Sequence, residues 1–120
     1  MDIREELAVA SGDVLARDYA ESIAKSVREV ESSGWEAREA WASDVLDWEI
    51  VWSSGREVVG VRLLITAGGP SCWVCFDGAG ADVVTSWACE PVHVYVDCPV
   101  LSSQVLDRYG EFLAVSGGAS

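Results

Sequence analysis

Hydrophobic and polar residues alternate through the middle of the chain, between Asp47 and Asp97. A period of two is typical of half-buried strands, because successive side chains of a strand point to opposite faces of the sheet. Turn-forming Gly, Pro, Ser and Asp residues separate the apolar runs. The pattern predicts an antiparallel meander of four to five strands, which cover residues 48–52, 58–66, 72–76, 83–89 and 92–97.

Two of these runs indicate their place in the sheet. Residues 58–66 are apolar on much of both faces, which favours an interior strand with helices over one side. In the last run, Val92, Val94 and Val96 alternate with polar residues. That run therefore reads as an edge strand with one face in water.

The segments before the sheet have a helical period. Apolar residues recur at steps of three and four, which marks one face of a helix ending near Ser32-Ser33-Gly34. Residues 2–10 predict a shorter helical stretch, with a break or cap at 11–13. Residues 35–41 predict another helix, capped by Ser33. The expected apolar face of the main helix consists of Leu15, Tyr19, Ile23, Val27 and Val30.

A closing helix is predicted over residues 100–114, with Ser102 or Ser103 as its cap and an apolar side of Val105, Leu106, Tyr109, Phe112 and Leu113. The fold class is therefore α+β: N-terminal helices, a meander sheet and a C-terminal helix. With 120 residues, half of them hydrophobic, the chain is expected to form one domain. Within residues 1–120, the N-terminal helical part spans about 2–42, the sheet about 47–97 and the C-terminal helix about 100–114.

Charge narrows the classes of partner. The formal net charge is −12, from 20 acidic and 8 basic residues. Such a chain repels nucleic acid and anionic membrane surfaces and attracts basic protein surfaces. High solubility explains the same charge without any partner. The sequence shows no signal peptide and no run long enough to span a bilayer, so we expect a cytoplasmic protein in a bacterial host, with its cysteines reduced.

The four cysteines match the number of ligands in a structural zinc site. However, Cys72 and Cys75 lie within one predicted strand, where residues three apart point to opposite faces. We therefore expect buried structural cysteines, no metal and no cofactor. A small zinc-binding protein with four cysteine ligands, Cys72, Cys75, Cys89 and Cys98, remains an alternative.

No constellation of catalytic residues stands out. His93 is the only histidine, and it falls on the polar side of a strand. The Gly68-Gly69-Pro70 turn lacks the Lys and the following helix of a phosphate-binding loop. We therefore expect the protein not to be an enzyme.

Acidic residues are concentrated between positions 29 and 49, where Arg38 is the only basic residue. Tryptophans are interleaved with them. Carboxylates and aromatic rings in this arrangement can imitate a phosphate backbone toward a basic groove, or they can form a solvated face over core tryptophans. The candidate partner-binding residues are Glu29, Glu31, Trp35, Glu36, Glu39, Asp44, Asp47 and Glu49.

Residues 47–114 resemble a group of small acidic proteins that phages and other mobile elements encode. The resemblance is carried by the run 60–65, the turn 68–70, a short strand, a glycine turn, a strand containing Trp87, and a terminal helix ending near 109–113. Members typically have a polar residue and an acid around the third strand, where this chain has Cys72 and Cys75.

Small acidic phage proteins often resemble anti-CRISPR proteins, which commonly occupy the nucleic-acid channel of a host complex. The resemblance therefore implies a non-enzymatic inhibitor that binds a basic site on a Cas effector and blocks its binding of target DNA. Its partner would be a host protein or ribonucleoprotein complex rather than nucleic acid or a membrane. A structural or regulatory phage protein that forms a homodimer is the alternative.

Overall fold

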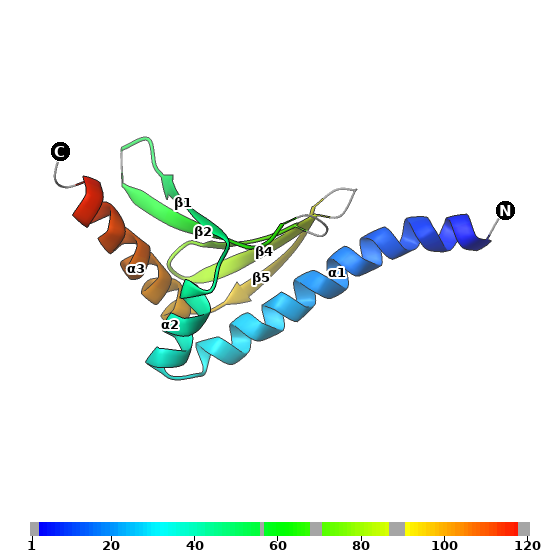
Figure 1. Ribbon diagram of the computed structural model, residues 1–120, viewed down its shortest axis with the longest axis horizontal. Helices are drawn as coiled ribbons and strands as arrows, with labels where there is room; N and C mark the ends of the chain where they lie inside the picture. Colours follow the sequence, from blue (N-terminus) through cyan, green and yellow to red (C-terminus); the bar gives the residue numbers. More distant parts are fainter. Residues whose placement is uncertain (1–2, 56, 68–70, 87–90, 118–120) are drawn as a thin grey trace.

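The computed structural model describes residues 3–55, 57–67, 71–86 and 91–117, with backbone only for 3–14 and 111–117. It confirms the predicted α+β class (Figure 1). Two helices precede five strands, and a third helix follows them. The elements are α1 (Ile3–Glu31), α2 (Trp35–Ser43), β1 (Asp47–Trp52), β2 (Val58–Thr66), β3 (Ser71–Phe76), β4 (Gly80–Ser86), β5 (Val92–Asp97) and α3 (Pro99–Gly117).

The five strands form one antiparallel sheet in chain order, β1-β2-β3-β4-β5. The register shifts between Val51 and Trp52, where β1 pairs with β2, and again between Leu64 and Thr66. The interior position of β2 and the edge position of β5 are therefore as predicted. The expected turn 68–70, and the residues after Ser86 assigned to the fourth strand, Trp87 and Cys89 included, lie outside the described residues.

All three helices pack on the same face of the sheet. Thr85 of β4 donates a hydrogen bond to the Ala16 carbonyl of α1 at 2.7 Å. Trp41 of α2 packs edge-on against Phe76 of β3, with ring centroids 6.0 Å apart. The core is the layer between helices and sheet, and its largest fully buried side chains include Phe76, Leu63 and Leu101.

The buried face of α1 includes the predicted Val27 but differs from the prediction toward the N-terminus. Three alanines, Ala16, Ala20 and Ala24, are fully buried, whereas Leu15 is half exposed. Because alanine has no side chain beyond Cβ, the helix backbone can come close to the sheet along this stripe. The larger residues Tyr19, Ile23 and Val30 flank the stripe and are only partly buried.

The predicted break at residues 11–13 is wrong, because α1 is continuous from Ile3 to Glu31. A single glycine inside a helix costs only about 1 kcal/mol, so a longer flanking helix can continue through Gly12. The N-terminal part of α1 extends past the sheet (Figure 1).

The predicted helix caps are also wrong. Gly34 precedes α2 without a side-chain cap, and the Ser33 hydroxyl donates instead to the Glu29 carbonyl at 2.8 Å. Helix α3 begins at Pro99, before Ser102 and Ser103. The Ser102 hydroxyl accepts a hydrogen bond from the Gly78 backbone N–H at 2.7 Å, so it fixes the β3–β4 turn against α3.

A matched pair of leucines tests the placement of the core. Leu101 in α3 is fully buried, whereas Leu15 in α1 is 51% exposed. Leu101→Ala should lower the free energy of unfolding by about 2–5 kcal/mol, because it removes apolar burial and leaves a cavity. Leu15→Ala should change it by less than about 0.5 kcal/mol. Urea denaturation followed by circular dichroism measures both; equal losses would contradict the packing.

Candidate partner-binding surface

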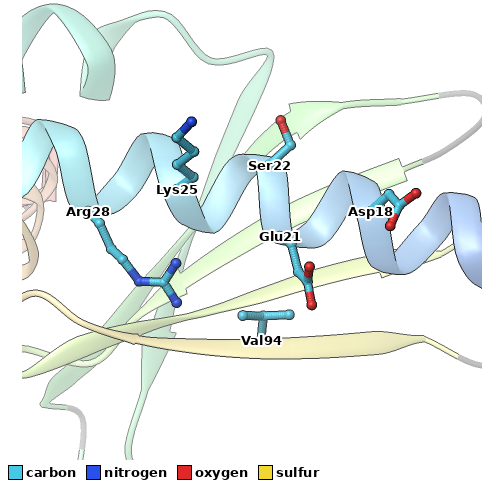
Figure 2. A pocket seen from close by; sticks show the side chains of 6 residues that line it. All are labelled: Asp18, Glu21, Ser22, Lys25, Arg28 and Val94. Carbon is cyan, nitrogen blue, oxygen red and sulfur yellow. The ribbon is translucent and has the colours of Figure 1, made fainter.

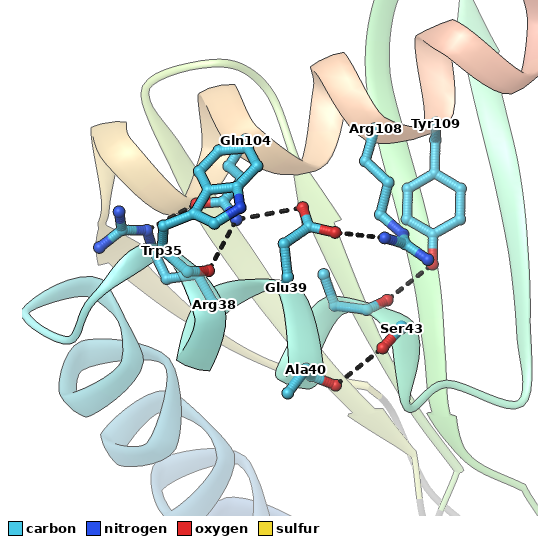
Figure 3. A network of polar contacts seen from close by, with 9 residues as sticks. Trp35, Arg38, Glu39, Ala40, Ser43, Gln104, Arg108 and Tyr109 are labelled. Carbon is cyan, nitrogen blue, oxygen red and sulfur yellow. Dashed lines mark hydrogen bonds and ion pairs between the residues drawn. The ribbon is translucent and has the colours of Figure 1, made fainter.

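A buried glutamine joins α2 to α3. The Gln104 side chain is 4% exposed, and its amide nitrogen donates to the Trp35 carbonyl at 3.2 Å and to Glu39 Oε1 at 3.1 Å. Its oxygen accepts from Arg38 Nε at 2.6 Å. The Arg38 guanidinium also donates to the Ser33 carbonyl. Figure 3 shows this network between the two helices, so Arg38 fixes the start of α2 against α3.

Glu39 belongs to the same network. Its Oε2 accepts from Arg108 Nη1 of α3, and both side chains are about three-quarters buried. Next to this pair, the Tyr109 hydroxyl donates to the Ala42 carbonyl at 2.6 Å, and burial raises the pKa of Tyr109. Breaking a partly buried ion pair leaves one charge without its partner. Glu39 therefore stabilises the packing of α2 on α3.

Glu31 caps the closing helix. Its carboxylate accepts hydrogen bonds from the backbone N–H groups of Val100 (2.7 Å) and Leu101 (3.0 Å). The first N–H groups of a helix have no partner within the helix, and the helix dipole favours a negative charge there. Glu31, at the end of α1, therefore serves as the capping group that the serines of α3 were expected to supply.

Glu49 of β1 forms an ion pair with Arg62 of β2 at 2.9 Å. The Arg62 guanidinium also lies over the Trp73 ring, 4.5 Å from its centroid. Both charged side chains are more than a third exposed, so this pair adds well under about 1 kcal/mol to stability. These residues lie on the face of the sheet opposite the helices.

The structure thus divides the eight predicted residues. Glu31, Glu39 and Glu49 bond to other elements of the chain, whereas Glu29, Trp35, Glu36, Asp44 and Asp47 are exposed. Asp47 makes only a local bond, in which its carboxylate accepts from the Trp48 backbone N–H at 2.8 Å. The exposed residues fall on two neighbouring parts of the fold, the region around α2 and the start of β1.

Trp35 has the most open position of the described tryptophans, with 60% of its surface exposed. It lies beside a shallow groove of about 440 Å³ between α2 and the start of α3. The other residues of this groove carry no local signal in the sequence, because the packing of the two helices brings them to Trp35. They are Arg38, Pro99, Val100, Ser103, Gln104 and Asp107.

A second groove, of about 630 Å³, lies between α1 and β5. In Figure 2, Glu21 and Arg28 extend toward Val94 of β5, and Lys25 points away. The groove is lined by two acids, Asp18 and Glu21, and by two bases, Lys25 and Arg28. The charges of its lining residues are thus of both signs in equal number.

The cysteines do not gather into a metal site in the described part of the chain. Cys72 is fully buried on the helix-covered face of β3, and Cys75 lies on the opposite face. Burial raises the pKa of Cys72 and of Cys98 to about 12. Within the described residues, no group of three or more His, Cys, Asp or Glu side chains is placed to hold a metal ion, and Cys89 lies outside them. His93 bonds Asp82 of the neighbouring strand at 2.8 Å.

No protein-family model matches the chain, and no match was found among curated proteins or solved structures. In the described residues, no helix is both long and apolar enough to cross a membrane.

Glu31 and Glu29, two residues apart on α1, give a matched test of the cap. Glu31→Ala removes the acceptor of two α3 N–H groups and should lower the free energy of unfolding by about 1–2 kcal/mol. Glu29→Ala removes an exposed carboxylate and should change it by less than about 0.5 kcal/mol. Thermal unfolding in a calorimeter measures both; the cap assignment fails if the two variants behave alike.

The thiols give a test of burial. At pH 8, a thiol with a pKa of about 12 is ionised in on the order of 10⁻⁴ of molecules, and the thiolate is the form that reacts. Cys72 and Cys98 should therefore resist iodoacetamide in the folded protein and react once guanidinium unfolds it. Cys75, on the uncovered face, should react faster than either. Peptide mass mapping measures the order in which the cysteines react. Rapid labelling of Cys72 in the folded protein would contradict its buried placement.

Proposed function

We propose that the protein is a non-enzymatic inhibitor of the anti-CRISPR type. Its acidic surface binds a basic, nucleic-acid-binding site on a Cas effector and blocks the binding of target DNA. The class of target comes from the resemblance of residues 47–114 to small acidic phage proteins. The mode of binding is supported by the chain's own charges and exposed side chains.

The observation that carries the proposal is the exposed tryptophan at the start of α2, with uncompensated carboxylates around it. Trp35 is 60% exposed beside the α2–α3 groove. Glu36 follows it in the first turn of α2, and Asp107 lines the same groove from α3. Both side chains are exposed. A large aromatic ring among charges of one sign is typical of a contact surface for a protein of opposite charge.

The two arginines described on α2 and α3 are engaged within the chain. Arg38 bonds Gln104 and the Ser33 carbonyl, and Arg108 bonds Glu39. Both arginines are thus held within the α2–α3 interface. Among the described residues, the exposed carboxylates of Glu36 and Asp44 form no ion pair, so they are available to an outside cation. A Lys- or Arg-lined groove supplies such cations, since it normally holds phosphates.

Charge reversal at exposed positions tests the proposal without disturbing the helix packing. Glu36→Lys combined with Asp44→Lys should weaken binding to a susceptible Cas effector at least about tenfold at low salt, because attraction becomes repulsion. The measurement is competition with labelled target DNA across a panel of purified effectors, repeated as the salt concentration rises. Wild-type inhibition should weaken with salt.

The control is Asp18→Lys combined with Glu21→Lys, which makes the same change in net charge on exposed positions of α1. It should inhibit as well as the wild type at equal salt. Glu39 is unsuitable for reversal because it bonds Arg108. Equal losses in both double variants would show that only net charge matters, and the α2 surface would not be the contact. Failure to inhibit any effector in the panel would refute the anti-CRISPR proposal.

A further inference from the structure

Strand β5 forms the edge of the sheet that lies beside helix α1. In the described part of the fold, β5 pairs with β4 alone. Just beyond the strand, the Cys98 backbone N–H donates to the Ala79 carbonyl at 3.3 Å and continues the same ladder. Because bonded positions alternate along an antiparallel pair, the backbone N–H and C=O groups of His93 and Tyr95 point away from β4. A further strand would bond to these outward groups.

No side chain of the described residues bonds to the outward backbone groups of β5. The side-chain contact with the backbone of this strand is on its inner side, where the Val96 carbonyl accepts from the Cys98 thiol at 3.6 Å. The His93 ring bonds Asp82 of the neighbouring strand, within the sheet. The strand contains neither Lys nor Pro, and its ladder with β4 has no register shift. This edge is therefore regular and free to pair.

Helix α1 presents a charged side next to the same edge. Glu21 and Arg28 lie seven residues apart, which is two helical turns, so they share one side of the helix. Both side chains extend toward Val94 of β5 (Figure 2), and both line the groove of about 630 Å³ between the two elements. Both are exposed, and neither forms an ion pair within the described residues. They are therefore available to outside groups of opposite charge.

This charged side of α1 is complementary to itself. A two-fold axis reverses the direction of the helix in a second copy, so Glu21 of each copy can meet Arg28 of the other. Asp18 and Lys25, also seven residues apart, repeat the order of acid before base along the helix. Each copy thus supplies both members of every pair, which favours a second copy over a foreign segment as the occupant.

The local balance of charge points to the same occupant. Each chain has a formal net charge of −12, so two copies repel each other wherever acids predominate. On and next to α2, the exposed charged side chains Glu36 and Asp44 are both acidic. The groove between α1 and β5 is instead lined by two acids and two bases. Two copies can approach along this side without a local excess of like charge.

We propose that the chain forms a homodimer through β5 and the adjoining side of α1, with the two-fold axis beside Val94. The two β5 strands pair antiparallel and join the two sheets into a continuous one. This register places His93 opposite Tyr95 of the second copy, and Pro91 opposite Asp97 of the second copy. No two like charges then face each other across the strands.

On the helix-covered face of the joined sheet, the two α1 helices lie side by side and antiparallel. Glu21 of each copy forms an ion pair with Arg28 of the other. The proposal goes beyond the proposed function and does not depend on it, because Glu36 and Asp44 take no part in this contact. A chain that has lost the dimer contact should therefore inhibit an effector as well as the wild type.

Sedimentation velocity of the full chain, from roughly 1 to 200 µM, tests the association; for so small an interface we expect a dissociation constant on the order of 10 µM. Glu21→Arg or Arg28→Glu alone should weaken the dimer at least about tenfold, because like charges then face each other. An equimolar mixture of the two variants should form a heterodimer with about the wild-type affinity. In that mixture, both basic positions of one variant meet both acidic positions of the other.

The control is Glu36→Arg on α2, which makes the same change in net charge as Glu21→Arg at another exposed position. It should leave dimerisation unchanged. Circular dichroism checks that all three variants keep the fold, which is expected because none of the three side chains bonds to another element in the described part of the chain.

Amide hydrogen exchange, followed residue by residue by NMR, tests the strand pairing. The N–H groups of His93 and Tyr95 should exchange at least about tenfold more slowly in the wild-type dimer than in the Glu21→Arg variant. A wild type that stays monomeric at about 200 µM would overturn the proposal. So would charge-reversal variants that dimerise as well as the wild type, or a mixture that does not restore association. Dimer-dependent protection of β1 in place of His93 and Tyr95 would assign the contact to the other edge, and would also overturn it.

Discussion

The rest of the architecture depends on the close packing of α1 against the sheet. Ala16, Ala20 and Ala24 bring the helix backbone near enough for the Ala16 carbonyl to accept a hydrogen bond from Thr85 of β4. With the helix held along β4 and β5, its last residue, Glu31, reaches the start of α3 and caps it. The Glu31 carboxylate, at the end of the first helix, thus helps to fix the position of the C-terminal helix.

The position of α1 also determines which parts of the sheet the helices leave uncovered. Helix α1 packs on β4 and β5, and α3 packs on β2 to β4, while the Trp48 ring of β1 lies against the Tyr109 ring of α3. The opposite face of the sheet carries half-exposed residues, including the Arg62–Trp73 stack. The sheet is therefore covered by helices on one face, and exposed carboxylates lie on α2 and on the connection from α2 to β1.

Local patterns predicted most of the elements. The alternating runs gave the strands, since period-two burial is visible in any five or six residues. Val27 of α1 is buried as predicted, but nearer the N-terminus the buried stripe lies one residue from the predicted one, because large apolar side chains were expected to face the core. Leu15 is instead exposed, and the neighbouring Ala16 is fully buried. Alanine gives little hydrophobic signal in a sequence, yet its small size determines how closely a helix approaches a sheet.

Tertiary contacts could not be predicted in this way. Glu31 lies 69 residues from Val100, and Gln104 lies 65 residues from Glu39. No spacing rule connects such pairs, so three acids of the predicted surface turned out to bond within the chain. The alternation in β1 predicts a strand with one buried face, and Ile50 does pack on the core, whereas Trp48 and Trp52 stay more than a third exposed.

Some acidic side chains bond within the chain and others are exposed, and this difference affects how the net charge of −12 can attract a basic protein. A carboxylate that bonds Arg108, or the N-terminus of α3, is already stabilised, so an outside cation gains little from it and must displace an internal partner. The exposed carboxylates of Glu36 and Asp44 have no such competitor among the described residues. If a basic partner binds, its attraction is therefore expected at these two positions on and next to α2, and not along the whole acidic run.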